Sequence, residues 1–82
     1  MVTSATTLQD LFDIAIQALP DIDRDEPFIV RDLFRGFEWN RIAKGNRTKL
    51  GSMFYSYAQG AGANCVKPVK KTPQNQQIYI KL

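Results

Sequence analysis

Residues 45–62 read GNRTKLGSMFYSYAQGAG and carry the strongest helical pattern in the chain. Their apolar residues recur at the spacing i, i+3, i+4, i+7 and i+8, which places them on one face of a helix. These residues are Leu50, Met53, Phe54, Tyr57 and Ala58. We expect Gly45 to end the preceding segment in left-handed geometry, Asn46 to cap the new helix, and Gly60-Ala61-Gly62 to stop it. The pattern predicts an amphipathic helix over residues 47–59.

The other face of this helix is polar and basic. Steps of about 100° per residue turn small or polar side chains outward. These residues are Thr48, Ser52, Tyr55 and Gln59, with Lys49 and Ser56 beside them. Arg47 and Lys49 fall in the predicted first turn, where cations are unfavourable for the helix dipole, so we infer a second purpose, phosphate binding at the free N–H groups. Gly51 costs about 1 kcal/mol relative to alanine, and we expect the close approach of a neighbouring backbone to compensate.

An earlier helix begins near the N-terminus of the chain. Thr7 and Asp10 have the spacing of a capping box, and the carboxylate lies near the positive end of the helix dipole. Apolar residues then recur at helical spacing as far as Leu19, where Pro20 disfavours helical geometry. The acidic stretch that follows, residues 21–27, is predicted to be a loop.

Short elements fill the middle of the chain. Residues 28–30 are β-branched or aromatic and predict a brief strand. Asp32 precedes a predicted helix of one or two turns, which Gly36 closes. A further turn of helix is expected to carry Trp39 and Ile42 inward at the spacing i, i+3.

The C-terminal segments predict a β-hairpin. Residues 65–70 and 77–82 are extended, and a polar turn with a proline separates them. In the second segment, Ile78, Ile80 and Leu82 alternate with Tyr79 and Lys81, the period of a half-buried strand. Pro68 has no N–H for a ladder, so it is expected at an edge or a bulge.

The sequence also predicts whether particular side chains are buried or exposed. We expect Phe34, Trp39 and Phe54 to pack in the core, while Tyr55 and Tyr79 point outward. Cys65 is expected to be a half-buried small hydrophobic residue and not a nucleophile, because no base lies near it in the sequence.

The order of elements is helix, strand, helix, helix and hairpin. This order predicts an α+β fold, a small winged helix-turn-helix, formed as a single domain by residues 1–82. The strand after the first helix is expected to pair with the terminal hairpin. In this architecture the third helix enters the DNA major groove, and the hairpin loop (the wing, residues 70–76) lies along the backbone.

The composition narrows the function. One cysteine and no histidine leave no internal disulfide, no Cys/His zinc site and no imidazole base, so we expect neither a cofactor nor an enzyme. Asp21, Asp23 and Asp25 alternate but lack the glycine and the distant glutamate of a calcium loop, so no metal site is predicted. With no visible signal peptide and no apolar run of about 20 residues, we expect a cytoplasmic protein.

Charge is divided unequally along the chain. Residues 1–30 hold six acidic residues against one arginine, whereas residues 31–82 hold ten basic residues against two acidic ones. Such asymmetry is typical of a protein with a polyanionic partner on one side. The candidate nucleic-acid-binding residues are Asn46, Arg47, Thr48, Lys49, Ser52, Tyr55, Ser56, Lys70, Lys71, Gln74 and Asn75.

Two functional hypotheses follow. The first is an accessory or regulatory protein that binds double-stranded DNA, with cations on phosphates and with Thr48, Ser52 and Tyr55 on base edges. The second is an interaction module that docks an acidic protein or forms a homodimer. In that dimer, residues 21–26 of one copy would meet the basic face of another.

The segment from Phe28 to Phe54 resembles a family of short uncharacterised proteins from low-GC Gram-positive bacteria and their mobile elements. The matching residues are Val30-Arg31-Asp32-Leu33-Phe34, Glu38-Trp39, Ile42, Lys44-Gly45, Arg47, Leu50-Gly51 and Phe54. The resemblance covers about a third of the chain and implies a small bacterial or phage-related protein. Because that family has no established activity, the resemblance supplies no catalytic or binding residue.

Overall fold

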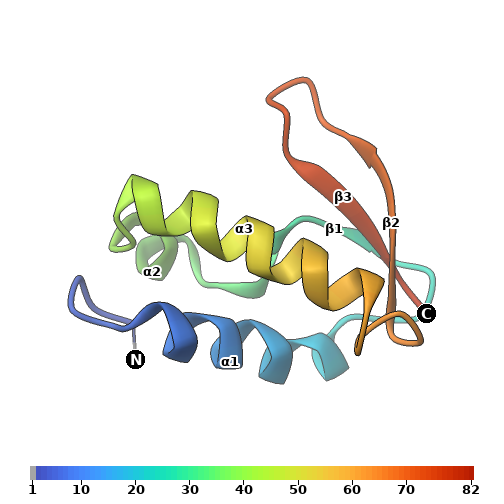
Figure 1. The fold of residues 1–82 in the computed structure, drawn as a ribbon, viewed down its shortest axis with the longest axis horizontal. Coiled ribbons are helices and arrows are strands. Elements are labelled where there is room, and N and C mark those ends of the chain that lie inside the picture. Colours follow the sequence, from blue (N-terminus) through green and yellow to red (C-terminus); the bar gives the residue numbers. More distant parts are fainter. Residues whose placement is uncertain (1) are drawn as a thin grey trace.

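Three α-helices and one three-stranded antiparallel sheet make up residues 2–82, the part of the chain that the computed structural model describes (Figure 1). The elements are α1 (Leu8–Ala18), η1 (Leu19–Asp21), β1 (Pro27–Phe28), η2 (Val30–Leu33), α2 (Gly36–Asn40), α3 (Lys44–Gln59), β2 (Val66–Lys71) and β3 (Gln77–Lys81), where η denotes a 3₁₀-helix. The α+β class and the order of the main elements are therefore confirmed.

The start of α1 follows the prediction. Thr7 has an extended backbone, and its side-chain oxygen accepts a hydrogen bond of 3.2 Å from the backbone N–H of Asp10. The helix ends at Ala18, one residue before the predicted end. Pro20 lies inside η1 because proline is tolerated in the first turn of a helix, where its missing N–H costs nothing.

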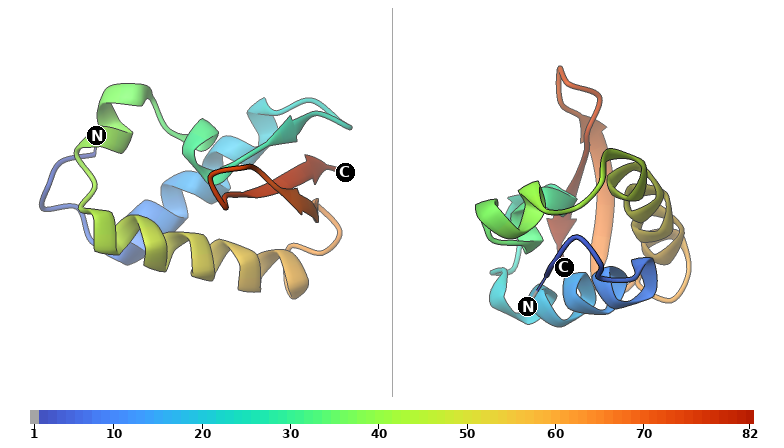
Figure 2. Two further views of the ribbon diagram at one scale, coloured as in Figure 1. Left: turned by 90° about the horizontal axis from the view of Figure 1, so that it is seen from above. Right: turned by 90° about the vertical axis from the view of Figure 1, so that its left-hand side faces the viewer.

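The sheet has the strand order β1-β3-β2, so the short strand after α1 pairs with the terminal hairpin as expected. Phe28 is opposite Tyr79, and Pro68 is opposite Tyr79 on the other side. Pro68 lies in an edge strand, and the pairing becomes irregular between Pro68 and Lys71. The prediction for this proline is confirmed. The hairpin projects away from the helices, and its tip extends beyond α3 (Figures 1 and 2).

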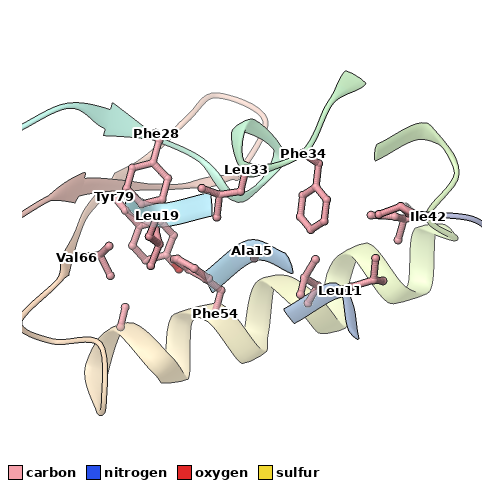
Figure 3. Packing of buried hydrophobic residues seen from close by; sticks show 13 residues of the cluster. Leu11, Ala15, Leu19, Phe28, Leu33, Phe34, Ile42, Phe54, Val66 and Tyr79 are labelled. Carbon is pink, nitrogen blue, oxygen red and sulfur yellow. The ribbon is translucent and has the colours of Figure 1, made fainter. Parts of the chain in front are cut away.

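The core lies where α1, α3 and the sheet meet (Figure 3). Phe54 of α3 is at its centre with no exposed surface, and its ring lies 4.9 Å from that of Tyr79 in a T-shaped pair. Phe28 stacks on Tyr79 at 5.7 Å and packs edge-on against Phe54 at 6.2 Å. Phe34 is also buried, as predicted. Such aromatic pairs add to the stabilisation that comes from burial alone.

The predicted orientation of β3 is wrong. Tyr79 is only 1% exposed, whereas Ile78 and Ile80 are half-buried and Leu82 is 45% exposed. Residues paired across a sheet share a face, and Tyr79 pairs with the core residue Phe28. The predicted alternation is shifted by one residue, and such a shift exchanges the two faces of a strand.

The middle of the chain also differs from the prediction. The strand ends at Phe28, so Val30 begins η2 instead of extending β1. Asp32 lies inside η2, where its Oδ2 accepts a hydrogen bond of 3.0 Å from the backbone N–H of Ile29. Gly36 is the first residue of α2 and does not close a helix. Ile42 is buried as expected.

The start of α3 is three residues earlier than predicted. Ala43 occupies the N-cap with extended backbone and no side-chain hydrogen bond, so Gly45 and Asn46 lie inside the first turn. No glycine among residues 2–82 has a positive φ, which excludes the left-handed ending assigned to Gly45. At the other end, α3 stops before Gly60 as predicted.

Candidate nucleic-acid interface

A groove of about 960 Å³ separates α3 from the hairpin. Its α3 wall is formed by Lys44, Arg47, Thr48, Gly51, Ser52, Tyr55 and Ser56. The facing wall comes from the hairpin and is formed by Lys71, Gln74, Asn75, Gln76, Gln77 and Tyr79. Ile29, Val30, Arg31 and Trp39 complete the lining. Figure 1 shows the hairpin rising beside α3, and residues of both elements line the groove.

The groove is electropositive. Four cationic side chains line it, Arg31, Lys44, Arg47 and Lys71, and no carboxylate of residues 2–82 does so. The two acidic residues of the basic segment, residues 31–82, form hydrogen bonds outside the groove. Asp32 accepts from Ile29, and Glu38 accepts a hydrogen bond of 3.0 Å from the backbone N–H of Val2. A concave surface lined by charges of one sign concentrates the field and attracts counter-charged ligands.

Arg47 is held in place at the groove wall. The carbon of its guanidinium lies 5.5 Å from the centre of the Trp39 ring, and its Nη2 donates to the backbone oxygen of Asn40 at 3.4 Å. Its buried Nε donates to no other group in residues 2–82. Trp39 is half-buried, packs against Phe34 at 5.7 Å and lines the groove, so it is only partly the core residue that we expected.

Two tyrosines line the groove. Tyr55 is 39% exposed, as predicted, and its Oη accepts a hydrogen bond of 2.9 Å from Nε2 of Gln59. Tyr79 lines the groove although its ring is buried. Burial, with a smaller contribution from the nearby Tyr55, raises the pKa of Tyr79 to about 12. The Tyr79 hydroxyl therefore keeps its proton at neutral pH and adds no negative charge to the groove.

Eight of the eleven predicted site residues line the groove, namely Arg47, Thr48, Ser52, Tyr55, Ser56, Lys71, Gln74 and Asn75. Lys49, Lys70 and Asn46 do not. Lys49 shares a helix face with Ser52 and Ser56 at the spacing i, i+3 and i+7, and it lies at the edge of the groove without lining it. Lys70 lies in the irregular part of β2 between Pro68 and Lys71, and it is not among the lining residues. Asn46 is four residues before the buried Leu50 and is itself half-buried.

Sequence reasoning missed several lining residues. Lys44 shares a helix face with Thr48 at the spacing i, i+4, and an earlier start of the predicted helix would have found it. Arg31 and Trp39 come from segments distant in the sequence, and no local pattern links them to α3. Gly51 was expected to meet a neighbouring backbone, but a Cβ built there has no atom within 4 Å.

Cys65 is exposed and not half-buried as predicted. Within the described residues, no three His, Cys, Asp or Glu side chains come close enough together to hold a metal ion. No helix over the same residues has the length and apolar character to cross a membrane.

Fold and groove together define a small α+β domain with a basic concave face. A family model described as Domain of unknown function (DUF1413) matches residues 13–81, and the chain belongs to this family. The match extends well beyond the Phe28–Phe54 resemblance and includes the second half of α1 and the whole hairpin. No curated protein and no solved structure is significantly similar to the chain.

Proposed function

We propose that the protein is a winged-helix domain that binds double-stranded DNA in the groove between α3 and the hairpin. The observation that carries the proposal is the lining of this groove, which combines four cations with hydroxyl and amide groups and has no carboxylate from residues 2–82. The strand order β1-β3-β2 and the projecting hairpin agree with the wing and the recognition helix of that architecture.

The chemistry divides into two kinds of contact. Lys44 and Arg47 on α3 and Lys71 on the hairpin would contact phosphates from both walls, which gives affinity that depends on salt and little on sequence. Thr48 and Ser52 on the exposed face of α3, together with Tyr55, would reach base edges in the major groove. The role would be that of a regulatory or accessory DNA-binding protein.

Fluorescence anisotropy on a labelled duplex of random sequence, at two salt concentrations, tests the proposal. The double variant Lys44→Ala/Lys71→Ala removes two groove cations. We expect it to weaken binding about tenfold and to reduce the slope of log K against log salt by about 2.

The matched control is Lys49→Ala/Lys70→Ala, which removes the same charge from the same helix and strand outside the groove. It should change affinity much less. Equal losses for both double variants would contradict the groove as the binding surface. A wild-type protein that does not bind at low salt would end the proposal.

A second candidate is self-association through the acidic loop, residues 21–26. Apart from the half-buried Ile22, every residue of this loop is exposed. Its carboxylates form no ion pair within residues 2–82, where Arg35 and Glu38 make the one pair present, at 4.0 Å. The loop of one copy would then enter the basic groove of another. Size-exclusion chromatography should show a dimer that dissociates as salt rises, and a monomer at every salt concentration would exclude this alternative.

A further inference from the structure

Gly51 is unfavourable for the stability of the helix at its position. It lies in the interior of α3, where glycine lowers the equilibrium constant for folding about fivefold relative to alanine. A glycine in a helix is commonly explained by a positive φ or by a neighbour that leaves no room for a side chain.

Neither explanation applies to Gly51. Its φ is not positive, and a Cβ built on its backbone meets no atom of residues 2–82 within 4 Å beyond its chain neighbours and the adjacent backbone of α3 itself. Gly62 is the contrasting case, because a Cβ there would overlap the ring of Tyr57. The fold itself therefore requires a glycine at position 62 but not at position 51.

The open space beside Gly51 is the groove. Gly51 lines it at the middle of the α3 wall, with Thr48 and Tyr55 one turn before and after it and Ser52 next to it. The nearby Arg47 lines the same wall and has a buried Nε without a hydrogen-bond partner in the described residues.

We propose that Gly51 is the point of closest approach between α3 and bound DNA, where a base edge packs against the glycine Cα. This inference rests on the proposed DNA-binding function. A missing side chain lets a ligand come closer to the helix backbone than any other residue would allow. The missing side chain therefore favours binding, which accounts for a glycine that the fold does not require.

The polar groups around Gly51 suit a base edge. Thr48 Oγ1 donates to the backbone oxygen of Lys44 at 3.3 Å and keeps lone pairs for a donor on a base. Tyr55 Oη accepts from Gln59 and keeps its own proton to donate. An acceptor and a donor therefore flank the bare Cα, which matches the mixed pattern that base pairs present in the major groove.

The test compares Gly51→Ala and Gly51→Gln with the control Gly45→Ala. Gly45 is also in α3 with no atom within 4 Å of a built Cβ, but it does not line the groove. Gly51→Ala should raise the midpoint of thermal unfolding by about 4 °C, because alanine is the better helix former. The same variant should bind a duplex selected from a random pool at least about fivefold more weakly, and Gly51→Gln more weakly still.

The possible results distinguish a failure of the inference about Gly51 from a failure of the proposed DNA-binding function. A more stable Gly51→Ala variant that loses affinity for the selected duplex more than for random DNA, while Gly45→Ala binds normally, supports a base-edge contact. Unchanged binding by both Gly51 variants overturns the inference and leaves the proposed function standing. An equal loss on selected and random duplexes overturns the base-edge assignment. Failure of the wild type to bind any duplex overturns the function and the inference together.

Discussion

The two faces of α3 follow the same helical period, but one is buried in the core and the other is exposed to the groove. On the core face, Leu50, Phe54 and Ala58 are buried against α1 and the sheet. On the groove face, Thr48 and Ser52 are exposed and contact little of the fold. Burial makes the first face a determinant of stability, whereas these two exposed side chains of the second face contribute little to it. The side chains of the groove face can therefore be interpreted in terms of a ligand.

The largest expected effect is on the core face. Phe54→Ala should lower the free energy of unfolding by about 3 to 5 kcal/mol, because it removes a fully buried ring and leaves a cavity. Its sequence neighbour Tyr55 faces the groove, and Tyr55→Ala should cost less than about 1 kcal/mol. Urea denaturation measures both values. Similar losses for the two variants would contradict the division of α3 into two faces.

Tyr79 connects the two regions, since its ring is in the core and it also lines the groove. Burial raises its pKa from the ordinary 10.0 to about 12, so between these values the folded chain keeps a proton that the unfolded chain loses. Stability should be full below about pH 10 and fall by roughly 2 to 3 kcal/mol as the pH rises to about 12. The difference between wild type and Tyr79→Phe in alkaline urea denaturation isolates this effect, and parallel pH profiles would contradict it.

The turn after α3 contains the buried Gly62. A Cβ at position 62 would overlap the Tyr57 ring, so Gly62→Ala should cost about 1 to 3 kcal/mol as that ring is displaced. Gly36→Ala is the control, because no atom lies within 4 Å of a Cβ built there. Thermal unfolding should place Gly62→Ala well below Gly36→Ala, and equal midpoints would show that the ring moves at no cost.

The smallest expected effect on stability is on the groove face. Thr48→Ala should change the free energy of unfolding by less than about 0.5 kcal/mol, because the side chain is exposed and makes one long hydrogen bond within its own helix. If Thr48 contacts a base edge, the same variant should show a relaxed sequence preference in a duplex selection. A loss of stability comparable to that of Phe54→Ala would remove the distinction between the faces.

Local patterns predicted the elements better than their boundaries and orientations. The apolar spacing of α3 and the Thr7 cap of α1 were read correctly because each depends on neighbours within one or two turns of helix. The first turn of α3 was misplaced because Ala43 caps it through backbone geometry alone, which leaves no side-chain pattern to recognise. The orientation of β3 was misjudged because Ile78 and Ile80 are more apolar than Tyr79, and only the pairing with Phe28 reveals the inner face.

By itself, the sequence determined the α+β class, the amphipathic character of α3 and the surplus of positive charge after residue 30, since these follow from composition and short-range periodicity. Only the tertiary structure decided which of those charges share a surface. Lys44 and Lys71 line the same groove while Lys49 and Lys70 do not, because the packing of the hairpin beside α3 determines which residues of each element line it. That selection depends on contacts between residues far apart in the chain, which no local pattern records.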